Sequence, residues 1–270
     1  MSLPLGISRG ISNKDYHADR TYVSSSGLKD ILKDPKKFHS KYILNLVDEK
    51  KKDTSSLDEG SYAHSLILEP ELIPNEYRFF PGDNKKHPDW NQFKKDNEGY
   101  ILLSKGQKVR TESLFIAYEK MPVAVELMKG CEHELTCCTN LNGIDVKVRA
   151  DAINIQKGYI VDIKTIRFTS EKGPFQSHIE TFNYLLSAAL YTMVFSKILG
   201  KPLDFYFLVL GKEDYSCSVY KVSSESMAWG MSQVNKALEL LTQYRQEGWK
   251  FEESPLQNIL KGLEYTIEEV

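Results

Sequence analysis

The sequence has no long hydrophobic run. No uninterrupted apolar stretch approaches the roughly 18 residues that a membrane-spanning helix requires. Its N-terminus, M-S-L-P-L-G-I-S, also lacks the basic segment and apolar stretch that are typical of a secretory signal. These absences argue against a membrane protein and a secreted protein, and they predict a cytoplasmic one.

The chain is also poor in cysteine, with four residues at Cys131, Cys137, Cys138 and Cys217. Their spacing fits neither a zinc motif nor a disulfide framework. We therefore expect small, buried and unpaired side chains in a reducing compartment.

A strong excess of one charge is absent as well, because 35 basic and 37 acidic residues leave a net charge of −2. Any contact with nucleic acid must then be local rather than spread over the whole surface. Residues 29–52 hold eight lysines, which form either a solvated face or a set of phosphate contacts. Lys36 and Lys37 are the candidates for DNA binding within this group.

With 270 residues, the chain is long enough for one domain with a substantial core. The order of helical and strand-like segments predicts an α/β (α+β) fold, with a central mixed sheet that contains hairpins and is flanked by helices. We expect a single domain over residues 1–270. It would have a largely helical part at 20–130, the sheet and a helix at 131–222, and a helical C-terminal part at 223–270.

Local signals place the elements of this domain. Asn142-Gly143 between two β-rich runs predicts a hairpin, and a second tight turn at residues 156–158 leads to a strand at 159–165. A polar loop at 166–178 and one long helix at 179–199 are expected to follow. Upstream, Ser104 and Gln107 form a capping-box pattern, and residues 70–90 are predicted to be irregular.

Two acids and a lysine stand out on the predicted strands. Because side chains alternate along a strand, Asp162 and Lys164 share one face, and Asp151 returns toward them across the turn. Two carboxylates and one ammonium suit metal-assisted phosphodiester hydrolysis, in which Mg²⁺ takes hard oxygen ligands. A surface ion pair is the alternative.

Two helices carry further candidates. His64 lies among small and apolar residues and is either a structural histidine or a metal ligand. On the second helix Tyr184, Ser187, Ala188 and Tyr191 fall on one face, which is either core or a surface that approaches a strand or a DNA backbone closely.

In their order, these segments resemble the PD-(D/E)xK nuclease superfamily, and more narrowly its RecE-type (exonuclease VIII-like) exodeoxyribonucleases, relatives of the lambda-type and RecB-type nucleases. Residues 24–38 resemble the family's serine, proline and phenylalanine motif, and residues 60–70 resemble its histidine helix. Residues 184–191 resemble its closing Tyr-x2-Gln-x3-Tyr helix. The resemblance implies a restriction-endonuclease-like nuclease core with helical N-terminal additions.

The resemblance also implies a site. Its metal ligands would be His64, Asp151, Asp162 and the backbone carbonyl of Ile163, while Lys164 would act on the water and the developing charge. A further acid, Glu134 or alternatively Glu132, would bind a second metal or its water. The cofactor would be Mg²⁺, with Mn²⁺ as a substitute.

The resemblance implies a metal-dependent exonuclease that acts 5′→3′ on double-stranded DNA ends in phage or prophage-type recombination. Expected partners are the DNA end, a single-strand annealing protein and further copies in a ring. The alternatives are a non-catalytic DNA-binding module and a structure-specific endonuclease. The chain departs from the family pattern at Ser187, where glutamine is usual, and at Asp34, where some relatives have a cluster-binding cysteine. We therefore expect no iron–sulfur cluster.

Overall fold

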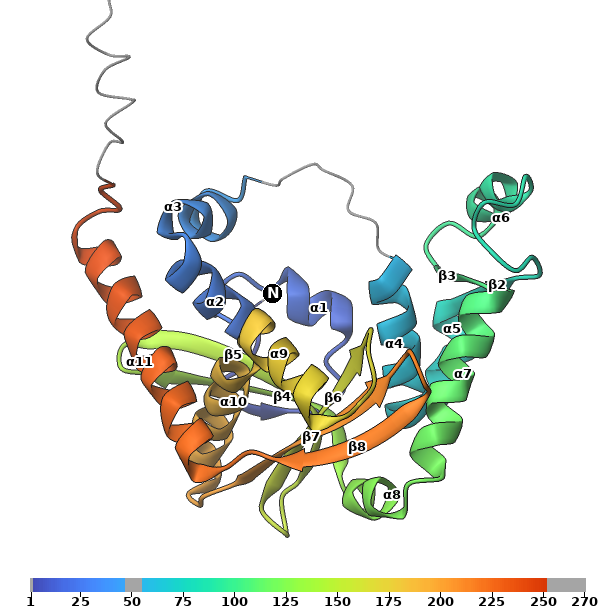
Figure 1. The fold of residues 1–270 in the computed structure, drawn as a ribbon. Coiled ribbons are helices and arrows are strands. Elements are labelled where there is room, and N and C mark those ends of the chain that lie inside the picture. Colours follow the sequence, from blue (N-terminus) through green and yellow to red (C-terminus); the bar gives the residue numbers. More distant parts are fainter. Residues whose placement is uncertain (1, 47–54, 252–270) are drawn as a thin grey trace, which may run out of the picture.

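A six-stranded mixed sheet forms the centre of the protein (Figure 1). The computed structural model describes residues 2–46 and 55–251. Strands β6 and β7 are parallel and every other neighbouring pair is antiparallel. The expected α/β fold is thus confirmed. In spatial order, the strands are β1 (Gly6–Ser8), β4 (Glu132–Leu141), β5 (Ile144–Asn154), β6 (Tyr159–Ile166), β7 (Asp204–Gly211) and β8 (Ser216–Lys221).

The β4–β5 hairpin turns where the sequence predicted it. Asn142 and Gly143 both have positive φ angles, 51° and 83°. A two-residue turn needs this backbone conformation, and Asn-Gly adopts it at little cost. The hairpin fixes a continuous register from Leu135↔Ala150 to Leu141↔Ile144.

The parallel pair β6–β7 is connected through two helices rather than one. α9 (Lys172–Phe182) and α10 (Tyr184–Leu199) meet at Asn183 in a bend of 75°. The prediction of a polar loop at 166–178 and an unbroken helix at 179–199 was therefore wrong. Asn183 has a left-handed backbone with φ +47°, which ends one helix and redirects the chain.

One face of the sheet packs against α2 (Ser25–Lys33), α10 and α11 (Ser224–Gln246), and Figure 1 shows these helices together on one side. The side chains that β4, β5, β6 and β7 direct toward them form the larger core cluster together with apolar side chains of these helices. Gly230 lets α11 approach the backbone of α10, because a Cβ there would lie 2.4 Å from the Leu185 carbonyl oxygen.

The other face carries α4 (Ser55–Leu68), α7 (Lys105–Glu119) and α8 (Pro122–Met128). Apolar residues from these helices pack on Val161 and Ile163 of β6 and Leu208 and Leu210 of β7. The capping box at the start of α7 is present, with the Ser104 and Gln107 side chains each accepting the other residue's backbone N–H.

The remaining elements surround this core. Residues 70–90 were predicted to be irregular, but β2 (Tyr77–Phe80) pairs with β3 (Ile101–Ser104) in a parallel two-stranded sheet. The expected helical tail beyond residue 251 lies outside the described residues. Besides β2 and β3, the elements around the core are α1 (Asn13–Ala18), α3 (Pro35–Phe38), the π-helix η1 (His39–Ile43), the 3-10 helix η2 (Pro70–Leu72), α5 (Ile73–Glu76) and α6 (Trp90–Asp96).

Within residues 2–46 and 55–251, no single helix is long and apolar enough to cross a membrane. The helices α9 and α10 reach that length and composition only as a bent pair.

Candidate active site

The candidate site lies where strands β5 and β6 separate. Their pairing runs from Asn154↔Tyr159 to Ala152↔Val161 and stops there, directly before Asp151 and Asp162. The Asp151 carboxylate takes over the role of a strand partner, because its Oδ2 accepts a hydrogen bond of 2.7 Å from the Ile163 N–H. Asp151 is thereby anchored beside β6 at the point where the strands part.

Asp162 and Lys164 point to the same face of β6 and form an ion pair. The Asp162 residue is only 4% exposed, and burial raises the pKa of its carboxyl group. Burial also acts to lower the pKa of Lys164, but the Asp162 and Asp151 carboxylates outweigh it and hold that pKa above its usual value. The lysine is therefore a half-buried cation beside two acids.

Glu134 reaches the same place from β4, in a strained conformation. Its φ is +49°, and it lies opposite Asp151 at the one position where the β4–β5 pairing is interrupted. A left-handed backbone is costly for a residue other than glycine and is often retained at functional sites. Burial and the Asp151 charge raise the pKa of Glu134 to about 8, although Arg149 Nε lies 2.6 Å from its carboxylate.

His64 completes the cluster from α4. Its Nδ1 is 3.7 Å from Asp151 Oδ2, and ligand atoms of His64, Glu134 and Asp151 all lie within 4.8 Å of one another. One imidazole nitrogen and two carboxylates suit a divalent cation. The Glu134 and Asp151 carboxylates repel each other here, and a bound cation would relieve that repulsion, so the residues fit a metal ion.

Asp162 is not a member of this three-residue group, and its carboxylate forms the ion pair with Lys164. The backbone carbonyl of Ile163 accepts a hydrogen bond of 3.4 Å from Lys164 Nζ. The hydrogen bond from the Ile163 N–H to Asp151 joins this part of β6 to the cluster, so the Asp162 carboxylate and the Ile163 carbonyl both lie beside it.

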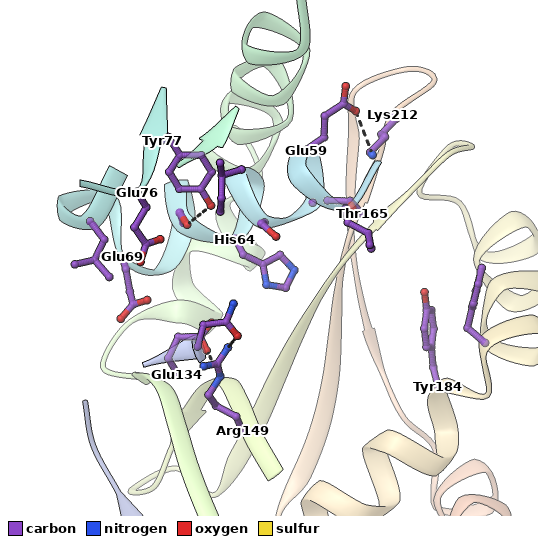
Figure 2. A pocket seen from close by; sticks show the side chains of 18 of the residues that line it. Glu59, His64, Glu69, Glu76, Tyr77, Glu134, Arg149, Thr165, Tyr184 and Lys212 are labelled. Carbon is purple, nitrogen blue, oxygen red and sulfur yellow. Dashed lines mark hydrogen bonds and ion pairs between the residues drawn. The ribbon is translucent and has the colours of Figure 1, made fainter. Parts of the chain in front are cut away.

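A cavity of about 1420 Å³ opens over the cluster. In Figure 2, His64 and Glu134 face each other near its centre, and Tyr184 stands on the side opposite Glu69. The lining also includes three cations, Arg149, Arg167 and Lys212, the last held 3.3 Å from Glu59. The cavity is large enough for a strand of nucleic acid and carries both signs of charge.

The other predicted residues lie apart from the cluster. Ser187 is buried on α10, and Tyr191 packs against the larger core cluster, so neither lines the cavity. Lys36 and Lys37 are exposed on α3, outside the lining. Between the two candidate acids, the structure brings Glu134 to the cluster, whereas Glu132 pairs with Arg9 at 2.6 Å.

The sequence reasoning missed Lys29 on α2. Lys29 Nζ and Lys164 Nζ lie over the same Tyr184 ring, 5.6 Å and 5.1 Å from its centroid. Burial lowers the pKa of Lys29 to about 8, and the positive charge of Lys164 adds to this. Its one signal in the sequence was a lysine that follows Leu28 in the segment Gly27-Leu28-Lys29-Asp30-Ile31-Leu32.

The fold and the site together define the PD-(D/E)xK class of nuclease-like proteins. Residues 24–255 match the family described as a PDDEXK-like domain of unknown function (DUF3799). Because this match covers most of the chain, the protein belongs to that family.

Solved structures give a consistent result. A "Putative exonuclease" from Eubacterium rectale is similar with a TM-score of 0.64 and 17% identity, covering 97% of each chain. Because the identity is only 17%, this similarity shows a shared fold and nothing more. The crystal structure of SSO0001 covers 67% of this chain and 86% of its own, with 17% identity and a TM-score of 0.29, which supports no argument. The comparison with curated proteins found no match. Family and fold together support a nuclease.

Proposed function

We propose that the protein is a metal-dependent exodeoxyribonuclease of the RecE type, which hydrolyses phosphodiester bonds at double-stranded DNA ends. The observation that carries the proposal is the convergence of His64, Glu134 and Asp151 within 4.8 Å, directly beside the Asp162–Lys164 ion pair. Metal ligands with a lysine beside them are what hydrolysis of a phosphodiester requires.

The metal would be held by the imidazole of His64 and the carboxylates of Asp151 and Glu134, with Asp162 and the Ile163 carbonyl adjoining. Mg²⁺, or Mn²⁺ in its place, would supply Lewis-acid stabilisation of a phosphoryl oxygen and acidify a bound water. The protein's own contribution begins with Asp151, whose bond to the Ile163 N–H fixes its carboxylate in place.

Lys164 is the group that acts on the reacting atoms. Its raised pKa keeps the side chain positively charged, so it can orient the attacking water and stabilise charge that develops on the phosphate. Lys29, which lies over the same Tyr184 ring, adds a second positive charge that a phosphate oxygen can use.

The finer features of the proposal rest on the resemblance to RecE-type enzymes. They are 5′→3′ polarity, a role in phage or prophage-type recombination, a single-strand annealing partner and a ring of identical subunits that encloses DNA. Light scattering tests the ring: a trimer or tetramer is expected, and a monomer at working concentrations contradicts it.

The test of the activity uses end-labelled duplex DNA with Mg²⁺ or Mn²⁺. Asp162→Asn and Lys164→Ala should each lower the rate by about 10²–10³-fold. Lys164→Ala removes the positive charge that stabilises the transition state, and Asp162→Asn removes the carboxylate that pairs with this lysine beside the metal ligands. Lys157→Ala is the control, since Lys157 is an exposed lysine at the far end of the same hairpin. The proposal fails if the wild type degrades nothing or if both variants keep full activity. Cleavage of closed circular DNA would instead identify an endonuclease.

A further inference from the structure

Four aromatic rings form a continuous wall on one side of the cavity. We call Phe168, His178, Phe182 and Tyr184 the aromatic wall. The ring centroids are 6.0 Å apart for Phe168–His178, 5.3 Å for His178–Phe182 and 5.6 Å for Phe182–Tyr184. All four residues line the cavity that holds His64 and Glu134.

The wall is open to solvent where it could contact a ligand. Phe168 is 47% exposed and Phe182 is 49% exposed, although both are fully apolar. Burial lowers the pKa of His178, so its ring is neutral at physiological pH and presents an aromatic face rather than a charge. Exposed apolar rings grouped beside a polar site are typical of a binding surface.

The backbone holds the wall in shape at some energetic cost. The break at Asn183 separates α9 from α10 and sets the rings of Phe182 and Tyr184 nearly parallel, with 19° between their planes. Asn183 has a left-handed backbone, and its buried Oδ1 has no hydrogen-bond partner among the described residues. Such strain is kept where a precise arrangement of side chains matters.

The wall ends at the proposed catalytic lysine. Tyr184 is the last ring, and Lys164 Nζ lies 5.1 Å from its centroid. At the opposite end, the Arg167 guanidinium lies 5.9 Å from the Phe168 ring. A strand whose phosphate lies at Lys164 would therefore place its neighbouring bases along the rings, with Arg167 near a further phosphate.

We propose that the aromatic wall binds unstacked nucleobases next to the scissile phosphate. This inference rests on the proposed function and names the substrate at the site as single-stranded nucleic acid. Within a duplex, stacked neighbours cover both faces of a base, so it offers no face to a protein ring. A frayed or single-stranded terminus does, and every base can stack because each has a π-face.

Binding is tested with a fluorescein-labelled oligothymidylate and an abasic oligomer of the same length, in Ca²⁺ to separate binding from hydrolysis. The two probes carry the same phosphates, so only the first reports base contacts. Phe168→Ala and Phe182→Ala should each weaken oligothymidylate binding by roughly 5- to 150-fold and leave abasic binding unchanged. Phe182→Trp should bind the oligothymidylate as tightly as the wild type does, because it keeps an aromatic ring at this position. Trp229→Ala, an equally exposed ring outside the cavity lining, is the control.

A cleavage measurement with Mg²⁺ gives a second readout. The wild type should cut frayed ends faster than blunt ends, and the two alanine variants should lose this preference. The inference is overturned if the two alanine variants bind both probes as tightly as the wild type does. It is also overturned if their affinity for the oligothymidylate and for the abasic oligomer falls by the same factor. Hydrolysis that still depends on Asp162 and Lys164 would then leave the proposed function standing. Base-dependent binding through the wall without hydrolysis would overturn the proposed function alone.

Discussion

At the scale of a single residue, the charge of Lys29 lowers the stability of the folded protein. Its half-buried side chain extends from α2 to the Tyr184 ring of α10, with Lys164 as a repelling neighbour and Asp162 and Asp30 as weaker attracting ones. The folded protein therefore holds the pKa of Lys29 at about 8, below its ordinary value of 10.5. Keeping this ammonium charged costs folding free energy.

We expect Lys29→Met to be more stable than the wild type by about 1–3 kcal/mol near pH 7, and slower in hydrolysis. Below pH 8 the lysine is protonated in the folded and unfolded states, so the full cost is present. As the pH rises from about 8 to about 10.5, the folded state loses its proton first, so the wild type recovers stability and the difference shrinks.

Urea unfolding at about pH 7 and about pH 10 checks both statements. Lys33→Met is the matched control, because Lys33 is exposed on the same helix and should change the free energy of unfolding by less than about 0.5 kcal/mol. A stability gain for Lys29→Met that is equal at both pH values would show that charge burial is not its cause.

At the scale of elements, the break between α9 and α10 depends on one residue. Glycine tolerates the left-handed backbone of Asn183, whereas a β-branched residue clashes there. We expect Asn183→Gly to leave the free energy of unfolding nearly unchanged and Asn183→Val to lower it by about 1–2 kcal/mol. Chemical denaturation measures both.

Glu180→Val is the control for this pair, because position 180 is exposed and helical, where valine costs only about 0.7 kcal/mol or less. Asn183→Val should also weaken oligothymidylate binding, since it displaces Phe182 from Tyr184. Equal stability of the Gly and Val variants would contradict a structural role for the left-handed conformation.

Elements with local signals could be predicted from the sequence. The Asn142-Gly143 hairpin and the capping box at Ser104 depend on residues next to each other in the chain, and both are confirmed. The break at Asn183 and the parallel pairing of β2 with β3 could not be predicted. No glycine or proline stands next to the break at Asn183. The pairing of β2 with β3 joins segments that only tertiary packing brings together.

The candidate site could likewise be predicted from the sequence only in part. Alternation along β6 was enough to place Asp162 and Lys164 on one face. It could not show that Glu134 adopts a left-handed backbone opposite Asp151. The position of Lys29 next to Lys164 depends on how α2 packs against α10, and no spacing rule contains that information.

At the scale of the whole molecule, charge is nearly balanced, with a net charge of −2. Long-range attraction of DNA is therefore weak, and binding must depend on local cations and on a metal that offsets the acids in the cavity. The extent of the domain, residues 1–270, stays a prediction.

Metal binding should therefore register in the stability of the entire protein. We expect Mg²⁺ or Mn²⁺ at roughly 100 times its Kd to add about 2.7 kcal/mol, which raises the Tm by about 5–10 °C in a protein of this size. The shift should be larger at about pH 8.5 than at about pH 6.5. Glu134, whose pKa is about 8, must lose its proton to bind the ion, so metal affinity rises with pH up to that value.

Thermal unfolding with increasing metal at both pH values measures this coupling. Asp151→Asn should abolish the shift, because it removes the carboxylate that lies closest to His64. Lys157→Ala, far along the same hairpin, should retain it. A shift of equal size in Asp151→Asn would mean that the metal binds elsewhere. A shift independent of pH would mean that Glu134 is not among its ligands, because only a ligand that loses a proton on binding makes the affinity follow its pKa.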